Sequence, residues 1–182
     1  FDFFVEHPKA KATFATKVIP EEFLDYNPEE KVRIRFSLMP QKISSILEPN
    51  TPNIIDRIKA INTFREAGYD VHINYSPVVY YKGWLQDYID LFTLVDEIVD
   101  DKENVLAEVI FLTHNISKHI YNLENHKKAE ELLWKPSVQE TKTSNYGGKN
   151  IRYQKDFKSN LINDFEYYHY RIVPWNTIRY IF

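Results

Sequence analysis

The sequence Val32-Arg33-Ile34-Arg35-Phe36-Ser37-Leu38 alternates apolar and polar side chains. Such alternation predicts a β-strand with two different faces, and it places Arg33 and Arg35 on the same one. Apolar residues at helical spacing predict a helix over 53–67, and a second strand is expected over 69–75. This strand–helix–strand order indicates βα units and therefore a parallel sheet in an α/β fold.

The rest of the chain continues the same alternation of strands and helices. Asn53 is expected to cap the 53–67 helix with its side chain, and the 69–75 strand is expected to end at Ser76-Pro77. Residues 138–155 are expected to form a β-hairpin around the turn-like sequence Asn145-Tyr146-Gly147-Gly148. We further predict a helix tail over 1–10, strands over 11–16, 105–113 and 176–181, and helices over 20–27, 84–99, 115–133 and 158–169. No repeat or linker interrupts this order, so a single domain spanning 1–182 is expected.

Composition excludes several classes of protein. The chain has 182 residues, of which 43% are hydrophobic and 15% aromatic, which is too apolar for a disordered chain. The absence of cysteine excludes a disulfide scaffold, a thiolate metal site and a thiol nucleophile within these residues. It fits a reducing compartment, and we expect a cytoplasmic protein. No apolar stretch of about 18 residues is present, so no membrane partner is expected.

The chain begins with Phe1 and not with Met. We interpret it as a fragment of a longer protein. The alternative is an ordinary domain whose first residues have been trimmed.

Positive charge gathers near the C-terminus. The formal net charge is −3, yet residues 139–158 hold five Lys or Arg against two Asp or Glu. Lys149, Arg152 and Lys155 alternate with the rings of Tyr146 and Tyr153. Cations interleaved with rings suit a surface that holds phosphates and stacks on bases, and a solvated hairpin is the alternative.

Three polar residues stand where predicted strands end. Lys17 follows the first strand, Ser37 ends the second, and Ser76 ends the third. Ligands of parallel βα folds gather at the C-terminal ends of strands. A lysine there can hold a carboxylate, and a serine hydroxyl can bond an amino, carboxylate or ribose group. The alternative is a solvated lysine and ordinary strand-end serines.

No metal site is predicted. The histidines show no two-His spacing with a third ligand at strand ends, and we expect His114 to be a core or capping residue. Asp56 and Arg57 are expected to pair on the surface of their helix. The other histidines considered are His72, His119 and His126.

Five stretches in this order resemble the C-terminal half of the spore photoproduct lyase family, from about Lys11 to Phe182. These proteins are radical S-adenosylmethionine (SAM) enzymes, and the founding member repairs a thymine dimer in DNA. The resemblance implies a TIM-barrel-like fold. Residues 1–135 would form the C-terminal half of a partial parallel (βα) barrel, and residues 136–182 a hairpin, helix and strand extension. The five stretches are 33–40, Glu48-Pro49-Asn50-Thr51-Pro52, Tyr75-Ser76-Pro77, Gly83-Trp84 and 140–153.

The resemblance also implies a SAM site. Thr16-Lys17 and the strand that ends in Ser37 match family patterns that bind the amino acid part of SAM. Ser76-Pro77 corresponds to an Ala-Pro near the adenine, so only its backbone role transfers. Glu48-Pro49 matches a recurring Glu-Pro, for which a site role and a loop or helix-cap role both stay open. The expected SAM-binding residues are Lys17, Ser37, Glu48, Ser76 and Pro77.

The hairpin resembles the family's Tyr-Gly-x-Gly-Lys-x-x-Tyr element, which lies near the dimer lesion. Tyr146-Gly147 and Lys149 match it. Asn145 stands where the DNA-repair members have arginine, so a sister branch with another substrate stays open. The partner implied is damaged duplex DNA, with expected contacts from Tyr146, Gly147, Lys149, Arg152 and Tyr153.

The activity implied is that of a radical SAM lyase. In the family a reduced 4Fe-4S cluster cleaves SAM, and the resulting 5′-deoxyadenosyl radical abstracts hydrogen from the lesion. The cluster ligands are expected upstream, together with the other half of the barrel, so this chain alone is expected to be inactive. Two other classes stay open: a non-catalytic α/β module that binds nucleic acid, and an α/β enzyme unrelated to radicals.

Overall fold

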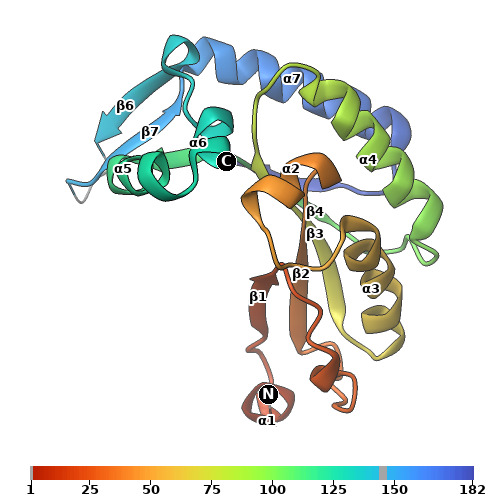
Figure 1. The fold of residues 1–182 in the computed structure, drawn as a ribbon. Coiled ribbons are helices and arrows are strands. Elements are labelled where there is room, and N and C mark those ends of the chain that lie inside the picture. The colour runs from red at the N-terminus through yellow and green to blue at the C-terminus, as the bar shows by residue number, and fades with distance from the viewer. Residues whose placement is uncertain (1, 144–146) are drawn as a thin grey trace.

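The computed structural model describes residues 2–143 and 147–182. Its centre is a five-stranded sheet in which every neighbouring pair is parallel. The parallel α/β architecture expected from the strand–helix alternation is thus confirmed (Figure 1). The strand order is β1 (Ala12–Thr16), β2 (Val32–Leu38), β3 (Asp70–Val78), β4 (Ala107–Phe111) and β8 (Ile178–Ile181).

Three helices pack on the apolar side of this sheet: α3 (Ile54–Glu66), α4 (Trp84–Ile98) and α7 (Lys155–Ile172). The core lies between these helices and the apolar positions of the strands. Phe36 of β2 meets Phe64 of α3 with ring centroids 5.4 Å apart, and Tyr75 of β3 meets Phe92 and Phe165 at 5.5 Å each. Edge-to-face packing of this kind adds to the stability gained from apolar burial.

The opposite face of the sheet is polar. Because side chains alternate along a strand, Arg33, Arg35 and Ser37 point away from the helices. Arg33 pairs with Asp70 at 2.8 Å, and Arg35 with Glu108 at 2.7 Å. The face predicted for the two arginines is therefore lined by cross-strand ion pairs.

A second, three-stranded sheet is antiparallel, with the order β5 (Thr113–Asn115), β7 (Lys149–Tyr153) and β6 (Gln139–Thr143). The hairpin expected over 138–155 is confirmed in its two arms. The strand expected over 105–113 is wrong as a single element, because Leu112 alone separates β4 from β5 and the two strands join different sheets.

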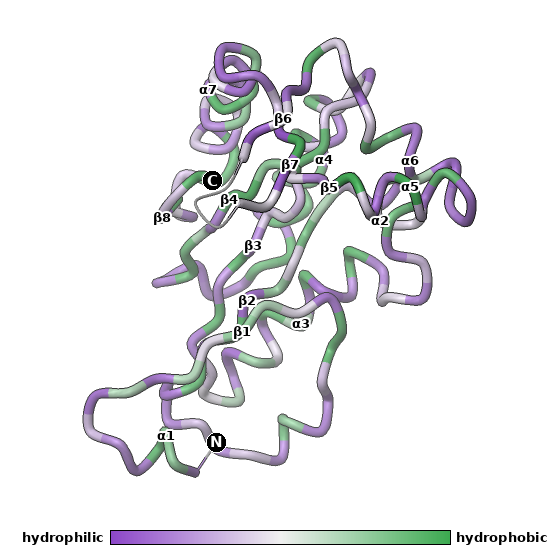
Figure 2. Tube along the Cα trace, turned by 90° about the vertical axis from the view of Figure 1, so that its left-hand side faces the viewer, coloured by the Kyte–Doolittle hydropathy of each residue, from purple (hydrophilic) through white to green (hydrophobic). Residues whose placement is uncertain are grey.

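Helices α5 (Ile116–Asn125) and α6 (Lys127–Leu133) and the 3-10 turn η2 (Pro136–Val138) connect β5 to the hairpin. Both views place them, with β6 and β7, far from α1 (Asp2–Glu6) near the N-terminus (Figures 1 and 2). The 136–182 extension is not a separate body, because β8 returns to the central sheet beside β4.

Three expectations about single elements are corrected. The helix expected from Pro20 is only a 3-10 turn, η1 (Glu21–Phe23), and the chain then turns into β2 through the positive φ angles of Glu29 and Glu30. Helix α2 (Gln41–Leu47) forms where none was expected. Strand β3 runs on through Ser76-Pro77, where a register shift between Tyr75 and Val78 accommodates the proline.

Candidate functional site

A cavity of about 370 Å³ opens beside the C-terminal ends of the parallel strands. This is the end of a parallel βα sheet at which ligands bind. Its walls come from the segment after β1, from the end of α2 and the loop after it, from Pro77 in β3, and from β5, α5 and α6. The lining residues include Lys17, Glu48, Pro77, Leu112, His114 and Asn122.

Lys17 lies at the mouth of this cavity directly after β1. The Thr16 hydroxyl donates to the Val18 carbonyl at 2.9 Å and accepts from the Val18 N–H at 3.1 Å, which holds the turn that carries Lys17. The Lys17 ammonium contacts Glu48 Oε1 at 2.6 Å and its side chain stays 44% exposed. An ammonium has three donors, so Lys17 can hold Glu48 and a second anionic group together.

Glu48 is buried between two cations. Its Oε2 accepts from Arg57 Nη1 at 2.8 Å, and Arg57 has no solvent exposure. The expected surface pair of Asp56 and Arg57 is therefore wrong. Arg57 shares the inward helix face with Ile54, Ile58 and Ile61, since these positions lie three or four residues apart.

The Arg57 guanidinium links α3 to β2, to α2 and to the loop between α2 and α3. Besides Glu48, it donates to the carbonyls of Ser37 at 3.0 Å and Pro52 at 3.1 Å. It also donates to the hydroxyls of Ser44 at 3.3 Å and Thr51 at 2.5 Å. Arg57 is thus a positioning residue that sequence reasoning missed. The available signal was an arginine inside an apolar helical stripe.

The two serines at strand ends differ from expectation. Ser37 is 3% exposed, and its hydroxyl accepts from Asn74 Nδ2 at 3.3 Å on the polar face of the sheet. Ser37 and Ser76 are not among the residues that line the cavity, whereas Pro77 is. The structure therefore brings Lys17, Glu48 and Pro77 to one cavity, with Ser37 linked to Glu48 through Arg57.

Ion pairs on the polar face shift the titration of its carboxyl groups. Burial acts to raise the pKa of Asp70, but hydrogen bonds from His72 and Arg33 outweigh it and lower that pKa to about 2. Burial likewise opposes ionisation of Glu108, and hydrogen bonds from Tyr180 and Arg35 hold its pKa below the usual value. Both carboxylates stay ionised at neutral pH.

A cation group forms on one face of the hairpin and the start of α7 from Lys142, Arg152 and Lys158, of which Lys142 also pairs with Glu140 at 3.0 Å. Arg152 and Lys158 lie over the ring of Phe182, at 5.7 and 5.6 Å from its centroid. Burial lowers the pKa of Lys158, and the nearby charges of Arg152 and Lys142 lower it further. Among the described residues, no carboxylate forms an ion pair with Arg152 or Lys158. Lys158 and Phe182 were not predicted as site residues.

The other expected hairpin contacts fall in different places. Lys149 lies three residues before Arg152 on β7, so its side chain points to the opposite face of the hairpin. The expected contact of Tyr153 with nucleic acid is corrected. The Tyr153 ring is buried and its hydroxyl accepts a hydrogen bond from the Tyr80 N–H at 2.7 Å, so the ring cannot stack on a base. Gly147 is exposed with φ of +81°, the left-handed backbone that favours glycine. Tyr146 lies outside the described residues.

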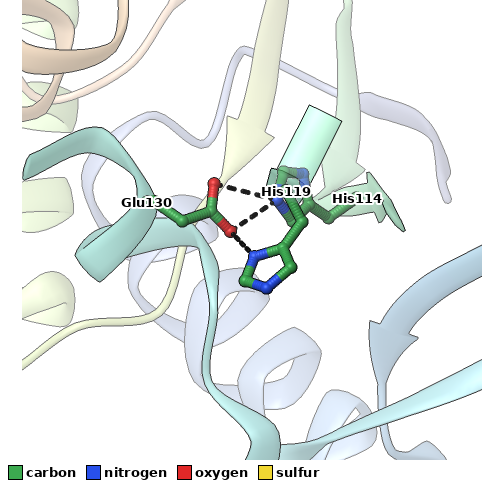
Figure 3. Close-up of side chains that lie close together, drawn as sticks. All are labelled: His114, His119 and Glu130. Atoms are coloured by element: carbon green, nitrogen blue, oxygen red, sulfur yellow. Dashed lines mark hydrogen bonds and ion pairs between the residues drawn. The ribbon is translucent and has the colours of Figure 1, made fainter. Parts of the chain in front are cut away.

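Two histidines expected to be scattered come together. His114 and His119 both contact Glu130, and a side chain from each of β5, α5 and α6 meets at one point (Figure 3). Folding of α5 and α6 into a helical hairpin brings these distant positions together.

A family model for spore photoproduct lyase matches residues 1–182. This chain belongs to the spore photoproduct lyase family. Spore photoproduct lyase of Bacillus subtilis (strain 168) is 27% identical over 174 residues, covering 93% of this chain and 50% of the relative. Spore photoproduct lyase of Geobacillus sp. (strain Y412MC61) is 29% identical over 101 residues, covering 54% of this chain and 29% of the relative.

Solved structures of spore photoproduct lyase share the fold. A cysteine-to-alanine mutant with dinucleoside spore photoproduct has a TM-score of 0.89 at 21% identity, covering 99% of this chain and 54% of that one. A second mutant, with bound AdoMet and dinucleoside spore photoproduct, gives the same values. This spore photoproduct lyase family chain spans about half the length of the relatives it matches. In its described part, no helix combines the length and apolar character needed to cross a membrane.

Proposed function

We propose that this chain supplies part of the SAM site and the nucleic-acid-facing hairpin of a radical SAM enzyme that repairs a DNA photoproduct. The observation that carries the proposal is the cavity at the parallel strand ends, with Lys17 at its mouth, in a chain of the spore photoproduct lyase family. In this proposal residues 1–135 are the C-terminal half of the barrel and residues 136–182 its extension. The upstream half of the barrel is the proposed partner.

The residues at the cavity fit the amino acid part of SAM. Lys17 retains donors for a carboxylate after pairing with Glu48, and the buried Arg57 keeps Glu48 in place. Pro77 offers apolar and backbone atoms to an adenine. SAM, when bound, supplies the 5′-deoxyadenosyl group, and this chain's residues bind and orient it. The chain has no cysteine, so it offers no thiolate to an iron–sulfur cluster.

The SAM proposal is tested by a pair of lysine variants in the full-length protein. Lys17→Ala should weaken SAM binding at least about tenfold, because a charged hydrogen bond contributes about 1.5–3 kcal/mol. Lys59→Ala, an exposed position on α3, is the matched control and should leave the affinity unchanged. Equal SAM affinities of the two variants, measured by calorimetry, would remove Lys17 from the site.

The nucleic-acid proposal rests on the cation group of Lys142, Arg152 and Lys158 on the hairpin and α7. The charges of Arg152 and Lys158 lie over the Phe182 ring in a chain that is acidic overall, so attraction to phosphate is local. Arg152→Ala and Lys158→Ala should each lower affinity for DNA of any sequence and reduce its salt dependence. Lys128→Ala, at an exposed site on α6, should do neither.

The same titrations address the lesion. Fluorescence anisotropy with intact and photoproduct-bearing duplexes at two salt concentrations separates phosphate attraction from lesion recognition. Tighter binding of the damaged duplex supports a repair substrate. If Arg152→Ala and Lys158→Ala bind both duplexes as the wild type does, the hairpin surface does not contact nucleic acid.

A further inference from the structure

Three potential metal ligands converge on the side of the cavity formed by β5, α5 and α6. His114 Nε2 lies 2.9 Å from Glu130 Oε1, and His119 Nδ1 lies 2.5 Å from the same oxygen (Figure 3). All three ligand atoms lie within 4.8 Å of one another. Two imidazoles and one carboxylate are a ligand set typical of zinc sites with a free coordination position.

Neighbouring side chains hold these ligands in place. Asn122 Nδ2 donates to Glu130 Oε2 at 2.8 Å, and this oxygen also lies 3.2 Å from His114 Nε2, while Oε1 contacts both histidines. The His119 ring stacks on Trp134 with centroids 3.8 Å apart and an interplanar angle of 18°. Such outer partners orient ligands at metal centres and raise affinity.

The charge balance at Glu130 also points to a cation. Its carboxylate is 2% exposed, and His114 is 4% exposed. Within the described residues, no lysine or arginine forms an ion pair with Glu130. A buried carboxylate without a full counter-charge is costly, and a bound divalent ion removes that cost.

We propose that His114, His119 and Glu130 bind one divalent transition-metal ion of the zinc type, with a fourth position left for water or a ligand atom. Tetrahedral bonds of about 2.0–2.1 Å place ligand atoms about 3.3 Å apart, so each histidine nitrogen must move from Oε1 by less than about 1 Å. The ion would link β5, which pairs with strand β7 of the hairpin, to helices α5 and α6. His114 and Asn122 also line the cavity of about 370 Å³, so the free position lies beside the candidate site.

The test uses the full 182-residue chain, which contains no cysteine, so thiolates add no background binding. Metal-free chain is titrated with Zn²⁺ by calorimetry and with Co²⁺ by visible absorption, which reports tetrahedral coordination. We expect one equivalent of metal per chain. At a Zn²⁺ concentration about 100 times the dissociation constant, the melting temperature should rise by about 5 °C or more.

Two variants and one control locate the site. Glu130→Gln and His119→Gln should each weaken Zn²⁺ binding by more than about tenfold, since even loss of an outer partner costs that much. His126→Gln, a histidine between α5 and α6 outside the cluster, should bind as the wild type does. Circular dichroism of the metal-free variants checks that they fold.

Metal binding by the wild type tests the proposal even if one of the variants does not fold. Wild-type chain that binds neither Zn²⁺ nor Co²⁺ would overturn the proposal and leave a hydrogen-bonded cluster only. Equal binding by the wild type, Glu130→Gln and His119→Gln would place the metal elsewhere and also overturn it. This proposal does not depend on the one for SAM and DNA, because its readout requires neither.

Discussion

The Arg57 guanidinium is the least replaceable group near the candidate site. It is fully buried, and its donors reach Glu48, two hydroxyls and two backbone carbonyls. A lysine ammonium is a point charge and cannot span this planar set of acceptors. Replacement would leave Ser37 and Pro52 carbonyls and part of the Glu48 charge without partners.

We therefore predict that Arg57→Lys lowers the free energy of unfolding by about 2 kcal/mol or more, because each buried acceptor left without a donor costs about 1–3 kcal/mol. Arg65→Lys is the matched control on the same helix. Arg65 pairs with the largely exposed Asp101, so the change should cost less than about 1 kcal/mol. Urea unfolding followed by circular dichroism measures both. Equal losses would show that the Arg57 contacts do not stabilise the fold.

Sequence reasoning identified some residues of the candidate site and missed others. Lys17, Glu48 and Pro77 reach one cavity because strand ends of a parallel sheet converge, which the strand pattern predicts. Arg57 was misplaced because the rule that charged residues face water overrode the helical spacing that buries it. Pairing of His119 with Glu130 depends on how two helices fold together, and no local pattern reports that geometry.

The start of helix α3 depends on a neighbouring helix. Asn53 precedes α3, yet its side chain makes no capping hydrogen bond. Instead, Gln41 at the start of α2 accepts the Ile54 N–H through Oε1 at 2.7 Å. A side chain twelve residues upstream of Asn53 thus satisfies one of the free N–H groups at the helix start.

We predict that Gln41→Ala lowers the free energy of unfolding by about 1 kcal/mol, the usual cost of losing an N-terminal cap. Asn53→Ala should change it by no more than a few tenths of that amount. Chemical denaturation of the two variants side by side gives the comparison. A larger loss for Asn53→Ala would mean that Asn53 provides the cap in solution.

Elements with long, regular patterns were predicted well. Strand β2 matches its expected range, and α3 and α4 lie within one residue of theirs, because each pattern spans several repeats. Strand β5 was missed since its three residues are too few to show a period. Helix α2 was missed because it spans only seven residues and no side chain caps its start.

Ion pairs on the polar face connect the strands of the central sheet across the whole molecule. Arg33 and His72 hold the folded-state pKa of Asp70 at about 2, below the ordinary value of 3.8. A carboxyl whose pKa is lower in the folded state stabilises the fold above its unfolded pKa. That stabilisation is lost as pH falls from about 4 to about 2.

The wild type should therefore be more stable than Asp70→Asn at pH 6 by about 1–2 kcal/mol, after allowance for solvent screening. The difference should shrink as pH falls to about 2. Asp25→Asn, at an exposed position, should show no such trend. Urea unfolding at a series of pH values measures each difference. A constant gap between the wild type and Asp70→Asn would contradict the role of the ionised Asp70.

The single residue between the two sheets constrains the length of the chain at that point. Leu112 separates β4 from β5, and its N–H donates to the Val78 carbonyl at 3.0 Å. One inserted residue would reverse which side chains of β5 face Glu130, because alternate residues of a strand point in opposite directions. Leu112 is buried in the core, so homologous chains should keep an apolar residue between Phe111 and Thr113 and should not gain or lose a residue there. An insertion or deletion there would indicate that β5, and the hairpin paired with it, no longer face the same cavity.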